Sequence, residues 1–163
     1  MEKLTGKQIL EIVEENYSVE SFGFDELTDT NTEIEFSAEE NQKAEEIEKR
    51  RDDFYALMQE EIGSLSYTER KKHPKFLEYQ GMPTRWEYER DLITNKLGLG
   101  KVVEIKQYGG EEMGSTWYSI KHFVDHDVYI KTDGYYQSYN GTDFHDGHGK
   151  EVKPVQKTVT VFE

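Results

Sequence analysis

The stretch that decides the fold is residues 116–144, TWYSIKHFVDHDVYIKTDGYYQSYNGTDF. Bulky and β-branched residues alternate there with polar ones, and only turn-forming residues interrupt the alternation. Such alternation is typical of pleated, half-buried strands. Asn140-Gly141 stands after one alternating run, and both residues tolerate the positive φ angles that a tight hairpin needs. The stretch therefore predicts the core of an antiparallel sheet.

The predicted sheet extends in both directions from this stretch. Its strands are expected at residues 102–108, 115–123, 128–139 and 151–162. Asp125-His126-Asp127 marks a turn, and residues 141–149 mark a glycine-rich loop. Gly134 predicts a bulge or bend in the third strand. Pro154 places the start of the last strand at a sheet edge, because proline has no N–H to donate.

The first 100 residues have the apolar spacing of helices. Helices are expected at residues 5–16, 37–62, 66–73 and 84–97, with a short strand at 33–36. Ser37 and Ser66 are candidate N-caps, and Gly63 and Gly98 are candidate helix ends. The buried positions are expected to be Ala44, Ile47, Phe54, Leu57, Met58, Ile62, Trp86, Ile93 and Leu97.

Helices gathered first and strands gathered last predict an α+β fold. We expect the N-terminal helices to pack on one face of a C-terminal antiparallel sheet of about four strands. A length of 163 residues predicts a single domain, 1–163, mainly helical over 1–100 and a β meander over 101–163.

The formal net charge of −14 is unevenly placed. Residues 1–63 hold 19 Asp or Glu and 6 Lys or Arg, a balance of −13. Such a field repels nucleic acid and anionic membranes and attracts basic protein surfaces. We therefore expect a protein partner with a basic surface, and no direct contact with nucleic acid or membrane.

The absence of cysteine excludes disulfides, thiolate metal sites and cysteine nucleophiles. No apolar run approaches the roughly 20 residues of a membrane-spanning helix. The N-terminus, MEKLTGKQILEI, lacks the apolar segment of a signal peptide. These features predict a cytoplasmic protein.

The candidate partner-binding residues are carboxylates on the predicted long helix, here called the acidic strip: Glu45, Glu46, Glu48, Asp52 and Asp53. A row of carboxylates can imitate the phosphates of a nucleic acid. The alternative is an ordinary solvated helix face, which is the commoner meaning of such charge runs. A basic cluster follows at Arg70, Lys71, Lys72 and Lys75, which we expect to pair with the acidic helix of the same molecule.

Histidine and aspartate gather at two predicted turns. The first holds His122, Asp125, His126 and Asp127, and the second holds Asp143, His145, Asp146 and His148. These side chains are ligands for zinc, manganese or iron. No ligand motif such as H-E-x-x-H is present, and such turns use the same residues for backbone hydrogen bonds. We therefore expect no metal and no cofactor, with a small metal-dependent hydrolase as the alternative.

Three segments of the chain resemble a family of small acidic proteins of tailed bacteriophages. They are residues 108–144, EVKPVQKTVTVFE at 151–163 and LTGKQILEIVEENY at 4–17. The resemblance covers about 101–163 and the N-terminal 4–17, and the middle of the chain departs from it. It implies a phage protein made in the bacterial cytoplasm, of a kind that often acts against host machinery, including defence systems.

The leading hypothesis is a non-enzymatic phage inhibitor whose acidic surface mimics nucleic acid on a host protein. Carboxylates would then replace phosphates in a site lined by Lys and Arg. The metal-dependent hydrolase and a virion or assembly component are the alternatives. In the assembly component, sheet edges would mediate homo-oligomer formation.

Overall fold

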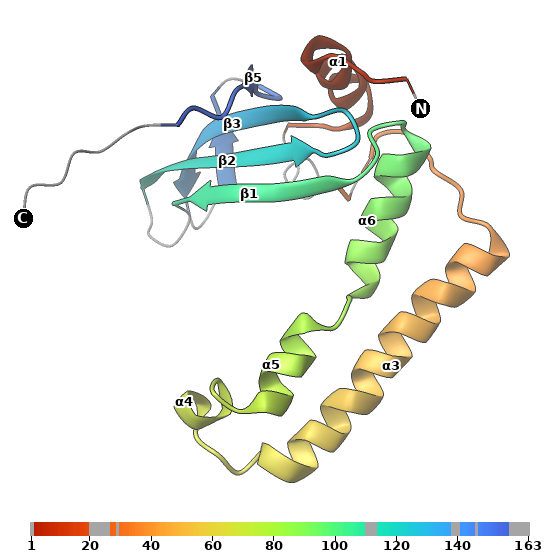
Figure 1. Ribbon diagram of the computed structural model, residues 1–163, viewed down its shortest axis with the longest axis vertical. Coiled ribbons are helices and arrows are strands. Elements are labelled where there is room, and N and C mark those ends of the chain that lie inside the picture. Colours follow the sequence, from red (N-terminus) through yellow and green to blue (C-terminus); the bar gives the residue numbers. More distant parts are fainter. Residues whose placement is uncertain are drawn as a thin grey trace, which may run out of the picture. The chain divides into compact units, whose positions relative to one another are not determined.

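The computed structural model describes residues 2–19, 27–28, 30–109, 114–137, 141–145 and 147–156. Helices come first and strands last (Figure 1). The helices are α1 (Gly6–Asn16), α3 (Ala38–Ile62), α4 (Tyr67–Arg70), α5 (Pro74–Gly81) and α6 (Arg85–Lys96). The strands are β1 (Val102–Tyr108), β2 (Ser115–Phe123), β3 (Val128–Gln137), β4 (Gly141–Phe144) and β5 (Lys150–Val152). The predicted α+β class is confirmed.

The chain forms two compact units. The sheet unit comprises residues 1–33 and 93–163, and the helical unit comprises residues 34–92. The single domain expected over 1–163 stays a prediction, and one calorimetric unfolding transition for both units would support it.

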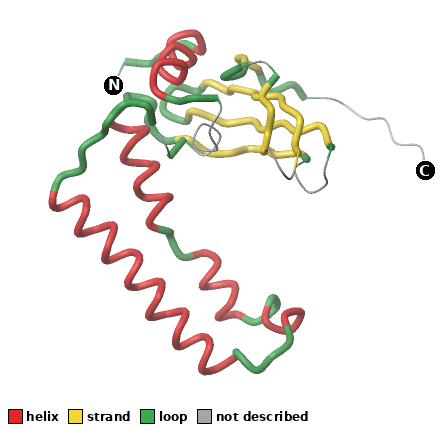
Figure 2. The backbone as a smooth tube through the Cα atoms, turned by 180° about the vertical axis from the view of Figure 1, so that it is seen from behind, coloured by secondary structure: helices red, strands yellow, loops and turns green. Residues whose placement is uncertain are grey.

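The sheet is antiparallel throughout and has the strand order β1-β2-β3-β4, with β5 also paired to β3. β5 pairs with the first half of β3, where Lys131 lies opposite Lys150. β4 pairs with the second half, where Gly134 lies opposite Phe144. The two short strands therefore share one side of β3, and the sheet is four strands wide. The strands are drawn in yellow in Figure 2.

One face of the sheet forms the core of its unit. Its buried residues alternate along β2 and β3: Trp117, Ser119, Phe123, Val128, Ile130 and Thr132. α1 covers this face, because Leu10 and Val13 line a small cavity together with Phe123 and Ile130. Thr5 fixes the start of α1 through a capping box with Gln8. This arrangement confirms the predicted first helix.

The prediction of a bulge at Gly134 is wrong. The β2–β3 register runs without a shift through Trp117 opposite Gly134, and the irregularity lies in β1, between Glu104 and Lys106. Glycine is needed at 134 because a Cβ there would lie 2.7 Å from the Asp143 carbonyl oxygen. The close approach of β4 therefore explains this glycine.

Two other predictions about the strands are wrong. Residues 141–144 form strand β4 rather than a loop, and residues 33–36 form no strand. The last strand, predicted over residues 151–162, is present only at its start, as β5. Residues 153–156 form no strand, and residues 157–162 lie outside the described residues. A hairpin is present, because Gln137 pairs with Gly141, but Gly141 begins β4 instead of lying in the turn, and residues 138–140 lie outside the described residues.

Gly134→Ala is expected to destabilise the protein by about 1–3 kcal/mol, the usual cost of overpacking, because β4 must shift to admit the methyl group. The matched control is Gly81→Ala at the end of α5, where nothing lies within 4 Å of the added Cβ. Urea unfolding measures both variants. Equal free energies of unfolding for Gly134→Ala and Gly81→Ala would show that β4 can shift away from an added methyl group at no cost.

The helical unit contains α3, α4, α5 and most of α6. Capping boxes open α3 at Ser37 and α4 at Ser66, as the sequence predicts, and α3 ends at Gly63. Pro74 was expected only to end a helix, but it also opens α5 as its first residue. Proline suits that position because the N–H it lacks would have no partner within the helix.

The buried stripe of the helical unit is narrower than predicted. Ala44, Met58 and Ile62 are buried, whereas Leu57 is 61% exposed and Trp86 is 44% exposed. Arg51 and aromatic rings supply much of the packing instead. The Arg51 guanidinium lies 4.2 Å from the centroid of the Tyr79 ring and donates to the Tyr79 and Met82 carbonyl oxygens at 3.2 and 2.8 Å. Phe54 stacks on the same ring at 6.5 Å.

Candidate partner-binding surface on α3

The acidic strip lies on the exposed side of α3. All five of its residues are exposed, while the buried residues Ala44, Met58 and Ile62 lie on the other side of the helix. Helical spacing sorts the strip into two rows. One row holds Glu45, Glu48 and Asp52, and the other holds Glu46 and Asp53. The five carboxylates of the acidic strip therefore face solvent, as the helical period of the sequence indicates.

Three of the five carboxylates already have partners within the helical unit. Glu48 pairs with Arg85 at 2.8 Å, and Asp53 pairs with Lys49 at 2.5 Å. Glu46 accepts a hydrogen bond from the Gln42 side chain at 2.9 Å. Sequence periodicity does not reveal the Glu48 pair, because Arg85 is 37 residues away along the chain.

These pairs raise the pKa values of the two cations. Hydrogen bonds that Arg85 donates to Glu89 and Glu48 raise the pKa of Arg85, and the hydrogen bond that Lys49 donates to Asp53 raises the pKa of Lys49. Both cations therefore stay charged and partly neutralise the strip. Glu45 and Asp52 have no side-chain partner among the described residues, which leaves them as the carboxylates most available to another molecule.

The basic cluster was expected to pair with the acidic helix, and one of its four residues does so. Lys75 forms an ion pair with Glu61 of α3. Lys71 instead lies 4.6 Å from the centroid of the Tyr67 ring. The Nε atom of Arg70 is buried and has no hydrogen-bond partner among the described residues.

Charge in the helical unit is more balanced than in the N-terminal part of the sequence. Residues 34–92 hold 15 Asp or Glu and 10 Lys or Arg, a balance of −5 out of the total of −14. The acidity of the unit is therefore concentrated on the exposed side of α3.

Two histidines of the predicted turns, His126 and His148, form hydrogen bonds with backbone groups. His126 is 4% exposed, and its Nδ1 accepts the Leu4 N–H at 3.0 Å. Nδ1 is an acceptor, so the proton is on Nε2, which donates to the Gly98 carbonyl oxygen at 3.0 Å. His148 Nε2 lies 2.7 Å from the carbonyl oxygen of Tyr17.

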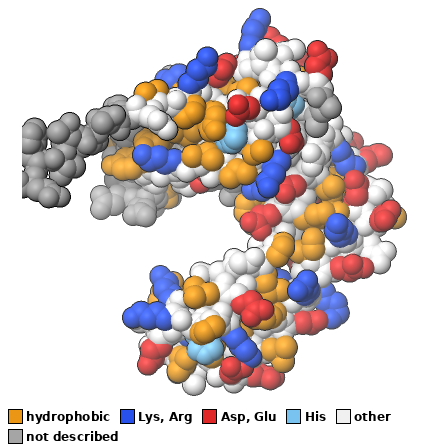
Figure 3. All heavy atoms as spheres, viewed as in Figure 1, with side chains coloured by type: hydrophobic (Ala, Val, Ile, Leu, Met, Phe, Trp, Pro, Cys, Tyr) orange, Lys and Arg blue, Asp and Glu red, His pale blue; other side chains and the backbone are white. Residues whose placement is uncertain are grey.

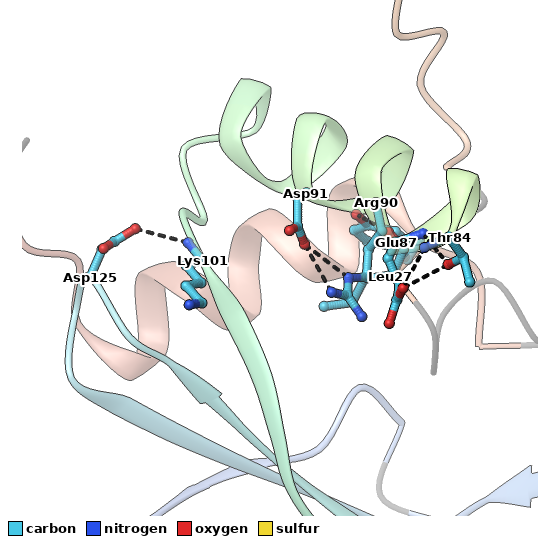
Figure 4. Close-up of polar contacts among 8 residues, drawn as sticks. Leu27, Thr84, Glu87, Arg90, Asp91, Lys101 and Asp125 are labelled. Atoms are coloured by element: carbon cyan, nitrogen blue, oxygen red, sulfur yellow. Dashed lines mark hydrogen bonds and ion pairs between the residues drawn. The ribbon is translucent and has the colours of Figure 1, made fainter. Parts of the chain in front are cut away.

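The aspartates of the first turn are also engaged. Asp125 accepts the backbone N–H of Lys101 at 2.8 Å, as Figure 4 shows, and Asp127 lies 3.2 Å from His122 Nε2. Of the second turn, Asp146 lies outside the described residues. Among the residues that are described, no three His, Asp or Glu side chains gather in a way that could hold a metal ion.

Zinc, manganese and EDTA are each expected to leave the melting temperature unchanged, because His126 and His148 are committed to backbone groups. Differential scanning fluorimetry with each metal and with chelator measures this. A rise of many degrees with one metal, abolished by His145→Ala, would instead support the hydrolase.

Comparisons with protein-family models, curated proteins and solved structures gave no match to this chain. The resemblance to tailed-phage proteins stays a prediction. In the described part of the chain, no helix has the length and apolar character needed to cross a membrane.

Proposed function

We propose that the protein is a non-enzymatic inhibitor, encoded by a bacteriophage, that acts in the host cytoplasm. The acidic strip would occupy a basic surface of a host protein, of the kind that binds nucleic acid or serves in defence. The observation that supports this most is the exposure of Glu45 and Asp52 without a side-chain partner in the described chain.

The physical basis is replacement of phosphates by carboxylates. A basic surface that binds nucleic acid is lined by Lys and Arg, and binding releases the counterions of the polyanion. Exposed carboxylates on a rigid helix can form the same ion pairs. Because the helix fixes their spacing before binding, little ordering is needed on contact.

The charge density of α3 limits how closely it can imitate DNA. α3 carries nine Asp or Glu in 25 residues. At a rise of about 1.5 Å per residue, this is roughly one carboxylate per 4 Å of helix. DNA carries about one charge per 1.7 Å of its axis. The strip therefore fits a local cluster of Lys and Arg better than a long nucleic-acid channel, and we expect a weaker salt dependence than for DNA binding.

The proposal is tested by affinity capture from extract of a bacterial host. The wild-type protein should retain a basic protein, and a DNA duplex added in excess should displace it from the column. The triple variant Glu45→Lys/Glu48→Lys/Asp52→Lys should not retain it. Retention of the same protein by wild type and variant, with no displacement by DNA, would contradict the proposal.

A further inference from the structure

The sheet face opposite α1 carries aromatic, aliphatic and lysine side chains in one contiguous set. Strand register arranges them in three rows across the strands: Val103, His122, Tyr129 and Val152; Lys106, Ile120, Lys131 and Lys150; Tyr108, Tyr118 and Asp133. We call this set the lysine–tyrosine face. A solvated sheet face is usually polar, and tyrosines are enriched where proteins bind one another. Figure 3 shows hydrophobic and basic side chains together over the sheet.

Rings on this face are stacked on their neighbours. Tyr118 stacks on Tyr108 at 5.6 Å, and His122 lies parallel to Tyr129 at 4.1 Å. The ammonium group of Lys131 lies 4.8 Å from the centroid of the Tyr118 ring. These contacts occupy ring faces that a nucleobase would need for stacking. Together with the net charge of −14, they favour a protein over a nucleic acid as the occupant.

The lysines outnumber the carboxylates in the middle of the face. Lys131 pairs with Asp133, and Lys150 lies 3.4 Å from the same carboxylate. Burial would raise the pKa of Asp133, but the two lysines outweigh it, so the pKa is lowered and the group stays ionised. Lys106 has no carboxylate partner among the described residues. Among the described residues, the further acids of this face lie at its margins, at Asp127 and Asp143.

We propose that the lysine–tyrosine face binds the acidic strip of a second copy of this chain, which makes self-association and host-partner binding compete for the same carboxylates. The competition rests on the proposed function of the strip. Glu45 and Asp52 are about 10.5 Å apart along the helix axis. Lys106 and Lys131 are two strands apart, about 9.6 Å. The two spacings match, so each carboxylate can meet one lysine.

Self-association would regulate the strip by mass action. Each copy carries one strip and one face, so the contact can close into a reciprocal dimer or continue as a chain. At high protein concentration the strip is covered, and at low concentration it is free for the host protein. High salt should weaken the association between copies, because salt screens exposed charges.

Sedimentation velocity tests self-association of the full chain in low and high salt. The protein concentration is varied about 500-fold, between 1 and 500 micromolar. Wild type should associate as concentration rises in low salt and should be monomeric in high salt. Lys106→Glu/Lys150→Glu should stay monomeric, and so should the triple strip variant. A mixture of these two variants should associate, because each then offers the surface complementary to the other. Lys3→Glu/Lys7→Glu, the matched control beside α1, should behave as wild type.

Three results would overturn the inference. The first is a monomeric wild type over the whole range. The second is association that survives Lys106→Glu/Lys150→Glu. The third is quenching of tyrosine fluorescence by a 20-mer of thymidine with loss of quenching in that variant, which would make the face a nucleic-acid site. Affinity capture separates this inference from the proposed function, because the face variant should still retain the host protein.

Discussion

Trp117→Ala is expected to lower the free energy of unfolding by about 3–5 kcal/mol, the range for truncating a large buried aromatic residue. Trp117 is 3% exposed and lies edge-on to Phe144 at 5.4 Å. Its removal leaves a cavity in the face that α1 covers and also deprives β4 of its aromatic partner. Ile130 is 5% exposed, so Ile130→Ala should lower the free energy of unfolding by about 2–5 kcal/mol for the same reason.

The matched control is Trp86→Ala, the same chemical change at a tryptophan that is 44% exposed on α6. It should cost less than Trp117→Ala, because nearly half of Trp86 is already exposed to solvent. Guanidinium unfolding followed by circular dichroism measures all three variants. Unfolding free energies of Trp117→Ala and Ile130→Ala equal to that of wild type would show that these strands do not build the core.

Much of the fold could be predicted from local signals. Ser37 and Ser66 open helices because their hydroxyls accept backbone N–H groups, and this depends only on residues three positions away. The alternation in β2 and β3 likewise fixes which side chains point inward. Such local patterns predict the structure correctly because the interacting residues lie within one helix or strand.

The errors arose where partners lie far apart in the sequence. The bulge near Glu104 cannot be read from the regular alternation of β1, because it depends on how β1 meets β2. Gly134 gave a bulge signal but is needed for the approach of Asp143. Leu57 has the spacing of a core residue and is nevertheless exposed, because the helical unit buries only a narrow side of α3.

The candidate site shows the same division. Exposure of the acidic strip follows from the 3.6-residue period, which the sequence contains. The pairing of Glu48 with Arg85 joins separate helices, so no sequence window contains it. The histidines at the two turns suggested a metal site as an alternative. In the structure, His126 instead forms hydrogen bonds with the backbone of Leu4 and Gly98, which only the fold brings close to it.

Reversal of the strip is the second large effect that we expect. Glu45→Lys/Glu48→Lys/Asp52→Lys should weaken binding to the captured host protein about 10- to 100-fold, since three exposed ion pairs are replaced by repulsion. The fold should survive, because all three residues are exposed and lysine is a good helix former. Loss of the Arg85 pair should cost little, because Arg85 also pairs with Glu89 at 2.7 Å.

The most direct test compares this triple variant with Glu11→Lys/Glu14→Lys/Glu15→Lys, which makes the same charge change on exposed residues of α1. Isothermal titration of the captured host protein with each, at low and high salt, separates local pairing from net charge. Local pairing by the acidic strip predicts that only the strip variant loses binding at both salts and that wild-type affinity falls as salt rises. Equal losses for both variants, or full binding by the strip variant with no salt dependence, would contradict it.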